Sequence, residues 1–142
     1  MNINELVLKV HQNAKDHGWW DKPRSMAELL CLIHSEVSEA LEEDRNCHKP
    51  GETYYSGKSE LYMQMGSMAY STLLANTPRF DFDQTGEKIS ITKPEGIPSE
   101  LADIVIRVMD ICGHYGIDLD AAIAEKMEYN RTRPMCHGGK KL

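Results

Sequence analysis

The chain has 142 residues, a mass of 16.1 kDa and a formal net charge of -6, the size of a single domain, and its acidic balance disfavours binding to nucleic-acid polymers or anionic membranes. Hydrophobic residues make up 41% of the chain and charged residues 27%, which is typical of a folded globular protein rather than a disordered or fibrous one. Every apolar run is shorter than the roughly 20 residues of a membrane span, and the N-terminus lacks the pattern of a signal peptide. A cytoplasmic location is therefore expected.

The first part of the chain predicts two helices. Apolar residues at helical spacing indicate a helix from about Asn2 to His17, which Gly18 is placed to end. The next residues, Trp19–Pro23, are predicted as an irregular connector to the second helix. Ser25 is the expected N-cap of a second helix, and its strongly apolar pattern extends to about Arg45.

A segment of different composition follows, and it predicts an insertion at about residues 49–95. It contains several Gly, Pro, Ser and Thr. Ser59–Asn76 has the spacing of a further helix, whereas Arg79–Asp83 and Lys88–Thr92 alternate like the two strands of a hairpin.

Helical patterns return after the insertion and complete the fold prediction. Ser99 is expected to cap a helix over residues 101–114, with acidic residues in its first turn facing the positive end of the helix dipole. Asp118 is expected to cap a last helix from Leu119 to about Arg133. Four long helices with one elaborated crossover predict an all-α fold, a four-helix bundle in one domain over the whole chain.

Two acidic pairs are the strongest candidate for chemistry. Glu36 and Glu39 are three residues apart on the second helix, and Glu100 and Asp103 are three apart on the third, so each pair shares a helix face. Both pairs lie in apolar segments, where unpaired carboxylates cost several kcal/mol. A shared divalent cation relieves that cost, and oxygen ligands favour Mg²⁺, with Mn²⁺ as a substitute. The alternative is that each pair is an ordinary solvated helix face.

Two other metal sites are weaker alternatives. Cys47–His48 and Cys136–His137 are adjacent pairs without the CxxC spacing that is typical of zinc sites. A di-iron bundle needs Glu-x-x-His motifs, but no His lies three residues after Glu36 or Glu100.

Several segments in a fixed order resemble the MazG-like family of the all-α NTP pyrophosphatases, in particular enzymes of the dCTP pyrophosphatase type. They are His34–Leu41 (HSEVSEAL), Pro94–Asp103 (PEGIPSELAD), Lys126–Pro134 (KMEYNRTRP) and His137–Lys140 (HGGK). The resemblance is weak over residues 49–92. It implies a helical bundle that assembles as a homodimer or homotetramer and hydrolyses nucleoside triphosphates between the α and β phosphates. The products are a monophosphate and pyrophosphate, and the role is the removal of non-standard or excess nucleotides.

The same resemblance assigns roles to individual residues. It implies metal ligands at Glu36, Glu39, Glu100 and Asp103, and phosphate contacts at Lys126, Asn130 and Arg133. Of these, Glu36, Glu39 and Lys126 are the residues expected to act in catalysis. The general base is left open, because family members often have a second glutamate where this chain has Ser35. A metal-ligating carboxylate or a metal-bound hydroxide would take that role.

Aromatic residues near the first helix are candidates for binding the base. In similar dCTP-hydrolysing enzymes, aromatic residues of this region and an upstream histidine hold the base, which points to Trp19, Trp20 and His11. Stacking on an indole contributes roughly 1 to 3 kcal/mol per base. The alternative is that both Trp residues anchor the core or an interface. Arg107 and Asp110 are expected to form ion pairs rather than to bind metal.

Two rival functions stay open at this point. Within the same class, the substrate could be another pyrophosphate-linked compound, such as phosphoribosyl-ATP or a deoxyuridine nucleotide. From a different class, the chain could be a catalytically silent helical dimer that binds nucleotide or a protein partner. Ser35 and the long insertion favour this second rival, and the complete acidic quartet argues against it.

Overall fold

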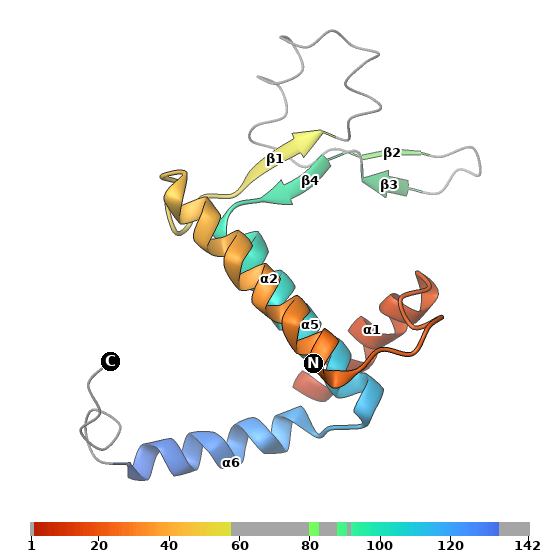
Figure 1. Cartoon of the computed structure of the whole chain (residues 1–142), viewed down its shortest axis with the longest axis vertical. Helices are drawn as coiled ribbons and strands as arrows, with labels where there is room; N and C mark the ends of the chain where they lie inside the picture. Colours follow the sequence, from red (N-terminus) through yellow and green to blue (C-terminus); the bar gives the residue numbers. More distant parts are fainter. Residues whose placement is uncertain (1, 58–79, 83–87, 91, 134–142) are drawn as a thin grey trace, which may run out of the picture. The chain divides into compact units, whose positions relative to one another are not determined.

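A computed structural model describes residues 2–57, 80–82, 88–90 and 92–133, and within them the chain is predominantly helical (Figure 1). The helices are α1 (Ile3–Asp16), α2 (Met26–Arg45), α5 (Ile97–Tyr115) and α6 (Leu119–Thr132). The strands are β1 (Tyr54–Gly57), β2 (Phe80–Phe82), β3 (Lys88–Ser90) and β4 (Thr92–Glu95). None of the helices in these ranges is both long enough and apolar enough to cross a membrane.

The chain divides into two compact units, which are described here one by one. The terminal unit consists of residues 1–29 and 106–142, and the central unit of residues 30–105. The central unit holds most of α2, the beginning of α5 and all the strands. The terminal unit holds α1, α6 and the end of α5.

The predicted bounds of the first two helices are confirmed to within about one residue, and Ser25 caps the second as expected. The side chain of Asn2 accepts a hydrogen bond from the backbone N–H of Glu5, and α1 ends before Gly18, whose φ of 72° suits glycine. The Ser25 hydroxyl accepts from the backbone N–H of Glu28 at 3.2 Å, directly before α2. Local side-chain chemistry therefore determines where both helices begin.

The third helix starts three residues earlier than a cap at Ser99 predicts. The helix α5 begins at Ile97, because the carbonyl of Gly96 accepts the backbone N–H groups of Ser99 and Glu100 at 2.9 and 3.2 Å. The Ser99 hydroxyl donates to the carbonyl of Pro94 at 3.0 Å instead of capping the helix. Glu100 stays in the first turn, as expected. Asp103 lies further along the helix than predicted.

Two antiparallel ladders occupy the described parts of the insertion. The predicted hairpin is present as β2 and β3, paired with Phe80 opposite Ser90. A second ladder, β1 with β4, was not predicted, and in it Ser56 lies opposite Lys93. Its strands carry no clear alternation, and Pro94 in β4 argues against a strand in the sequence. The helix predicted over Ser59–Asn76 lies outside the described residues.

The core of the terminal unit forms between α1 and the end of α5. Val7, Met109 and Cys112 are buried there, with Ile3, Leu6, Val10, Val108 and Leu119 packed against them. The last helix is attached through polar contacts at its start. The Asn4 side-chain amide donates to Asp118 at 2.8 Å, and its carbonyl accepts from the backbone of Asp120 at 3.3 Å. Asp118 caps α6, as predicted.

Large apolar side chains remain exposed in both units. On α2 and α5 in the central unit, these are Leu30, Val37, Leu41, Leu101 and Val105, each between 47% and 52% exposed. On α6, which has no buried residue, they are Met127 and Tyr129. The apolar side chains of α2 are therefore only partly buried within one chain.

Candidate metal centre and neighbouring residues

Three of the four predicted metal ligands lie together in the central unit. Glu36 and Glu39 lie one turn apart on α2, and Glu100 lies in the first turn of α5. Each offers one carboxylate oxygen, and these oxygens are all within 4.8 Å of one another. Glu36 is 7% exposed and Glu100 is 3% exposed, whereas Glu39 faces solvent. We call this set the acidic trio.

Glu100 is the most constrained member of the acidic trio. Burial raises the pKa of its carboxyl group above the ordinary value, and the charges of Glu39, Asp103 and Glu95 act in the same direction. Its Oε2 atom is buried and has no hydrogen-bond partner within the described parts of the chain. A buried carboxylate oxygen without a partner is costly. A cation that accepts this oxygen as a ligand would remove the cost.

The donor set and its spacing suit a hard divalent cation. Magnesium binds oxygen at about 2.1 Å in octahedral geometry, so neighbouring ligand oxygens are about 3 Å apart and opposite ones about 4.2 Å. The oxygens of the acidic trio lie within 4.8 Å of one another, which requires only small side-chain movements. Because all three ligands are carboxylates, the residues fit Mg²⁺ or Mn²⁺ better than a softer metal.

The fourth predicted ligand, Asp103, lies near the trio but is not part of it. It is half-buried on α5, and its charge helps to raise the pKa of Glu100. Asp103 lies one turn after Glu100 on α5, and its role as a metal ligand stays a prediction. Ser35, which replaces the glutamate common in the family, is exposed and donates its hydroxyl to the carbonyl of Leu32 at 3.0 Å.

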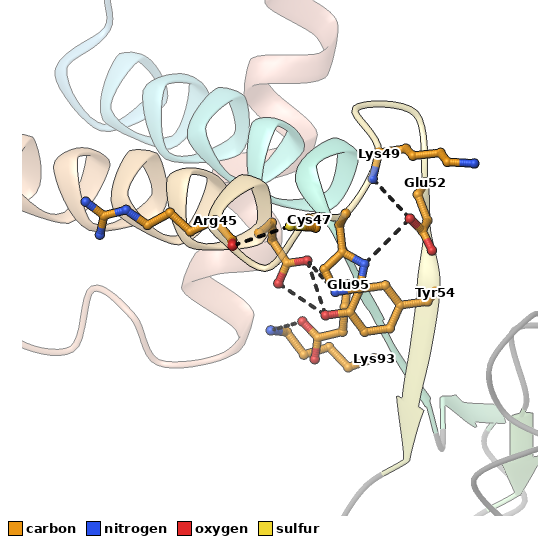
Figure 2. Close-up of polar contacts among 9 residues, drawn as sticks. Arg45, Cys47, Lys49, Glu52, Tyr54, Lys93 and Glu95 are labelled. Carbon is orange, nitrogen blue, oxygen red and sulfur yellow. Dashed lines mark hydrogen bonds and ion pairs between the residues drawn. The ribbon is translucent and has the colours of Figure 1, made fainter.

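Two residues of the β1–β4 ladder that the sequence did not indicate as site residues, Lys93 and Glu95, act electrostatically on Glu100. Lys93 and Glu95 are on β4, and their side chains meet at 2.8 Å between Nζ and Oε2 (Figure 2). The hydroxyl of Ser56 on β1 donates to the other carboxylate oxygen of Glu95, also at 2.8 Å. The sequence signal that could have indicated them is a lysine and a glutamate two residues apart, just before the second acidic pair. Pro94 between them argues against a strand, so the strand was not predicted.

A second group of polar residues connects the end of α2 to β1. The hydroxyl of Tyr54 lies 3.1 and 3.2 Å from the two carboxylate oxygens of Glu43, and its ring stacks on His48 at 4.8 Å between centroids. Burial raises the pKa of Tyr54, and the nearby carboxylates add to the effect. Cys47, a candidate zinc ligand, is an exposed free thiol. Its proposed partners Cys136 and His137 lie outside the described residues.

The predicted phosphate-binding residues lie on α6 in the terminal unit. Lys126 and Asn130 are exposed and one turn apart. The Nζ of Lys126 lies 5.0 Å from the ring centroid of Tyr129, and the guanidinium of Arg133 lies 5.7 Å from the same ring. The structure thus gathers two of these cations around one aromatic ring.

The predicted base-binding residues form an aromatic cluster in the terminal unit. Asp110 is 6% exposed, and its Oδ1 accepts from His11 Nδ1 at 2.7 Å and from Trp20 Nε1 at 3.0 Å. The Trp20 ring stacks on His114 with centroids 3.8 Å apart and an interplanar angle of 5°. Asp110 therefore contacts His11, a pairing that is ionic only when the imidazole is protonated, and the expected ion pair stays a prediction.

Trp19 is enclosed differently from Trp20. The guanidinium groups of Arg24 and Arg107 lie over its ring, at 4.1 and 4.5 Å from the centroid. Arg24 also donates to the carbonyl of Trp19 at 3.2 Å and pairs with Glu28 at 2.6 Å. Trp19 is therefore held by cation–π contacts.

Comparisons with protein-family models, with curated proteins and with solved structures found no match to this chain. The chemistry proposed for it therefore depends on its own residues.

Proposed function

We propose that this chain is a cytoplasmic, Mg²⁺-dependent nucleoside triphosphate pyrophosphohydrolase with the four-helix MazG-like fold. The single observation that supports this proposal most is the acidic trio, whose oxygens lie within 4.8 Å of one another. Its member Glu100 has a buried Oε2 atom with no hydrogen-bond partner among the described residues. Solvated helix faces do not bury carboxylates in this way, which favours a cation site over the alternative reading.

Within this proposal, Glu36, Glu39 and Glu100 hold Mg²⁺, and Asp103 completes the ligand set from the next turn of α5. The bound metal supplies charge neutralisation of the phosphate oxygens and a more acidic water. Glu39 is exposed whereas the other two members of the trio are buried, so it is the member best placed to meet substrate and water.

The cations of α6 are proposed to bind the phosphate chain. Lys126 and Asn130 lie one turn apart on this helix, and Arg133 follows as its C-cap, so a triphosphate at the end of the helix can contact the three residues together. Lys126 and Asn130 are exposed, which leaves them accessible to a ligand.

The aromatic cluster of the terminal unit is proposed to contribute to base binding. Asp110 holds His11 and Trp20 by short hydrogen bonds, which fixes the orientation of both rings before a base arrives. Trp19 adds a second indole, positioned by Arg24 and Arg107. One face of Trp20 is covered by His114, so a base would stack on the opposite face of this preorganised ring.

A second copy of the chain is proposed to cover the exposed apolar side chains, giving a homodimer or homotetramer. Val37 and Leu41 on α2 and Leu101 and Val105 on α5 are about half exposed. Large apolar side chains mark an interface when they are exposed together in one patch, and a second copy of the chain would cover those on α2 and α5. Sedimentation of the purified protein measures the assembly state directly.

The test is the release of pyrophosphate, rather than single phosphate, from a panel of normal and modified nucleoside triphosphates in the presence of Mg²⁺. Glu39→Gln should lower kcat by at least about 100-fold on the best substrate, because it removes a metal ligand without adding bulk. Glu42→Gln is the matched control, since Glu42 lies on the same helix and, in the part of the chain that the structure describes, pairs with exposed Arg45 at 3.6 Å. Nucleotide binding without turnover across the whole panel would contradict the proposal and favour a silent binding protein.

A further inference from the structure

We propose that Lys93 binds the phosphate chain of the substrate beside the acidic trio, so that the β1–β4 ladder of the insertion forms part of the active site. This inference rests on the proposed function, because it assumes that the trio holds a metal–nucleotide complex. It assigns a role to the segment at about 49–95, where the sequence resembles the family least.

The backbone places Lys93 at the edge of the trio. The strand β4 runs directly into α5, whose first turn carries Glu100. The sharp connection requires Gly96, which has a φ of 102° and no room for a side chain, since a Cβ there would lie 2.5 Å from the carbonyl oxygen of Glu52. This junction determines how far Lys93 lies from the buried carboxylate.

The ammonium group of Lys93 is held in place rather than free in solvent. Lys93 and Glu95 point to the same face of β4 because they are two residues apart. Glu95 accepts from Lys93 with one oxygen and from Ser56 on β1 with the other, both at 2.8 Å. Ser56 therefore orients Glu95, and Glu95 orients Lys93. In Figure 2 the two side chains of β4 meet, whereas Lys49 extends away from them.

Lys93 is within electrostatic range of the trio. The hydrogen bond that Lys93 donates to Glu95 raises the pKa of Lys93, and the charges of Glu95, Glu100 and Glu39 act in the same direction. Conversely, Lys93 lowers the pKa of Glu100 against the effect of burial. The positive charge of Lys93 is therefore close enough to act electrostatically on Glu100, one of the carboxylates that are proposed to hold the metal.

The ammonium group of Lys93 is also accessible to a ligand, and its positive charge would offset the negative charge of the proposed complex. The Lys93 side chain is 56% exposed, whereas Glu95 is 18% exposed, so a ligand can reach the ammonium group. The trio, its neighbours Asp103 and Glu95, and a triphosphate are all anionic, so one or two Mg²⁺ ions leave excess negative charge. A lysine at this edge compensates that charge and acts on phosphate as a point cation.

A purely structural role for Lys93, as counter-charge to Glu95, makes a different prediction. In that case its removal would disturb the ladder and the trio together, and metal binding would weaken with nucleotide binding. In the proposed role, removal of the ammonium group weakens nucleotide binding only. Metal binding without nucleotide should stay as tight or become tighter, because a positive charge near the cation is gone.

The experiment compares Lys93→Met with Lys49→Met in the full-length protein. Lys49 lies in the same unit, in the loop before β1, where its charge acts on Glu52. Two measurements are made: Mn²⁺ binding without nucleotide by electron paramagnetic resonance, and calorimetric binding of the α,β-imido analogue of the best substrate. Lys93→Met should weaken the analogue at least 10-fold with unchanged or tighter Mn²⁺ binding. Lys49→Met should change neither by more than about twofold.

The outcomes separate this inference from the proposed function. If the wild-type protein releases pyrophosphate but Lys93→Met binds the analogue as well as wild type, the role of Lys93 is wrong and the proposed function stands. If Lys93→Met loses Mn²⁺ binding as well, its role is structural and the inference is again wrong. If the wild-type protein neither binds Mn²⁺ nor hydrolyses any nucleotide, both proposals fall.

Discussion

Replacement of Glu100 by Gln should increase the stability of the metal-free protein and remove its response to Mg²⁺. The side chain is 3% exposed, and its ligand oxygen lies within 4.8 Å of those of Glu36 and Glu39. Two unit charges at that distance repel by about 1 kcal/mol with the dielectric constant of water and by about 3.5 kcal/mol at an effective value of about 20. Glutamine keeps the shape of the side chain and removes the charge.

Part of this repulsion is already relieved by protonation, since burial raises the pKa of Glu100. We therefore expect Glu100→Gln to stabilise the metal-free protein by about 1 to 2 kcal/mol, or roughly 3 to 7 °C in Tm for a chain of this length. In wild type, Mg²⁺ at 100 times its Kd adds about 2.7 kcal/mol, or roughly 8 to 10 °C. In the variant this shift should fall below about 2 °C.

The assay is thermal unfolding with and without Mg²⁺ at pH 7.5, followed by circular dichroism. Glu42→Gln is the control, because it removes a charge from an exposed pair with Arg45 and should keep the full Mg²⁺ response. The reasoning would be refuted if Glu100→Gln kept the wild-type response, or if it lost stability without metal. The first result would mean that Glu100 is not a metal ligand, and the second that it is not held against other charged carboxylates.

Three further predictions concern individual contacts. Because the pKa of Glu100 is raised in the folded protein, metal-free wild type should lose stability as pH rises from about 4.5 through that folded pKa. This loss should be absent in Glu100→Gln. Denaturant titrations at several pH values measure both proteins, and the same dependence of stability on pH in both would contradict the prediction. Gly113→Ala should lower the free energy of unfolding by about 1 to 3 kcal/mol, because the new Cβ would lie 2.5 Å from the Cβ of His11 on α1. Gly51→Ala is the control, because no atom of the described residues lies within 4 Å of the new Cβ. It should leave the free energy of unfolding unchanged when both variants are measured by denaturant titration. Asp110→Ala should cost about 2 to 4 kcal/mol and change the near-ultraviolet signal of Trp20, because two partly buried donors lose their acceptor; a loss below about 0.5 kcal/mol would show that the acceptor is dispensable.

Most of the helical framework could be predicted from the sequence. The caps at Asn2, Ser25 and Asp118 each form within three residues of the helix that they begin. Such contacts depend on local geometry alone, so spacing in the sequence is enough to find them. The start of α5 was the exception, because the backbone at Gly96 took the role that the sequence suggested for Ser99.

The candidate site could be predicted only in part. Glu36 and Glu39 share a face of α2 by helical spacing alone. That Glu100 reaches them is a tertiary fact, and its buried oxygen could not be inferred from an E-x-x-D pattern. Lys93 was missed because its strand pairs with β1, from which it is separated by more than thirty residues along the chain.

The sequence by itself determined which segments are helices and which acidic side chains share a helix face, since both follow from interactions between residues a few positions apart. The tertiary structure alone decided that Glu100 joins the pair on α2, that Asp110 orients both His11 and Trp20, and that Lys93 lies beside the carboxylates. These contacts join residues distant in sequence, and their energies depend on burial and charge, which exist only once the chain has folded.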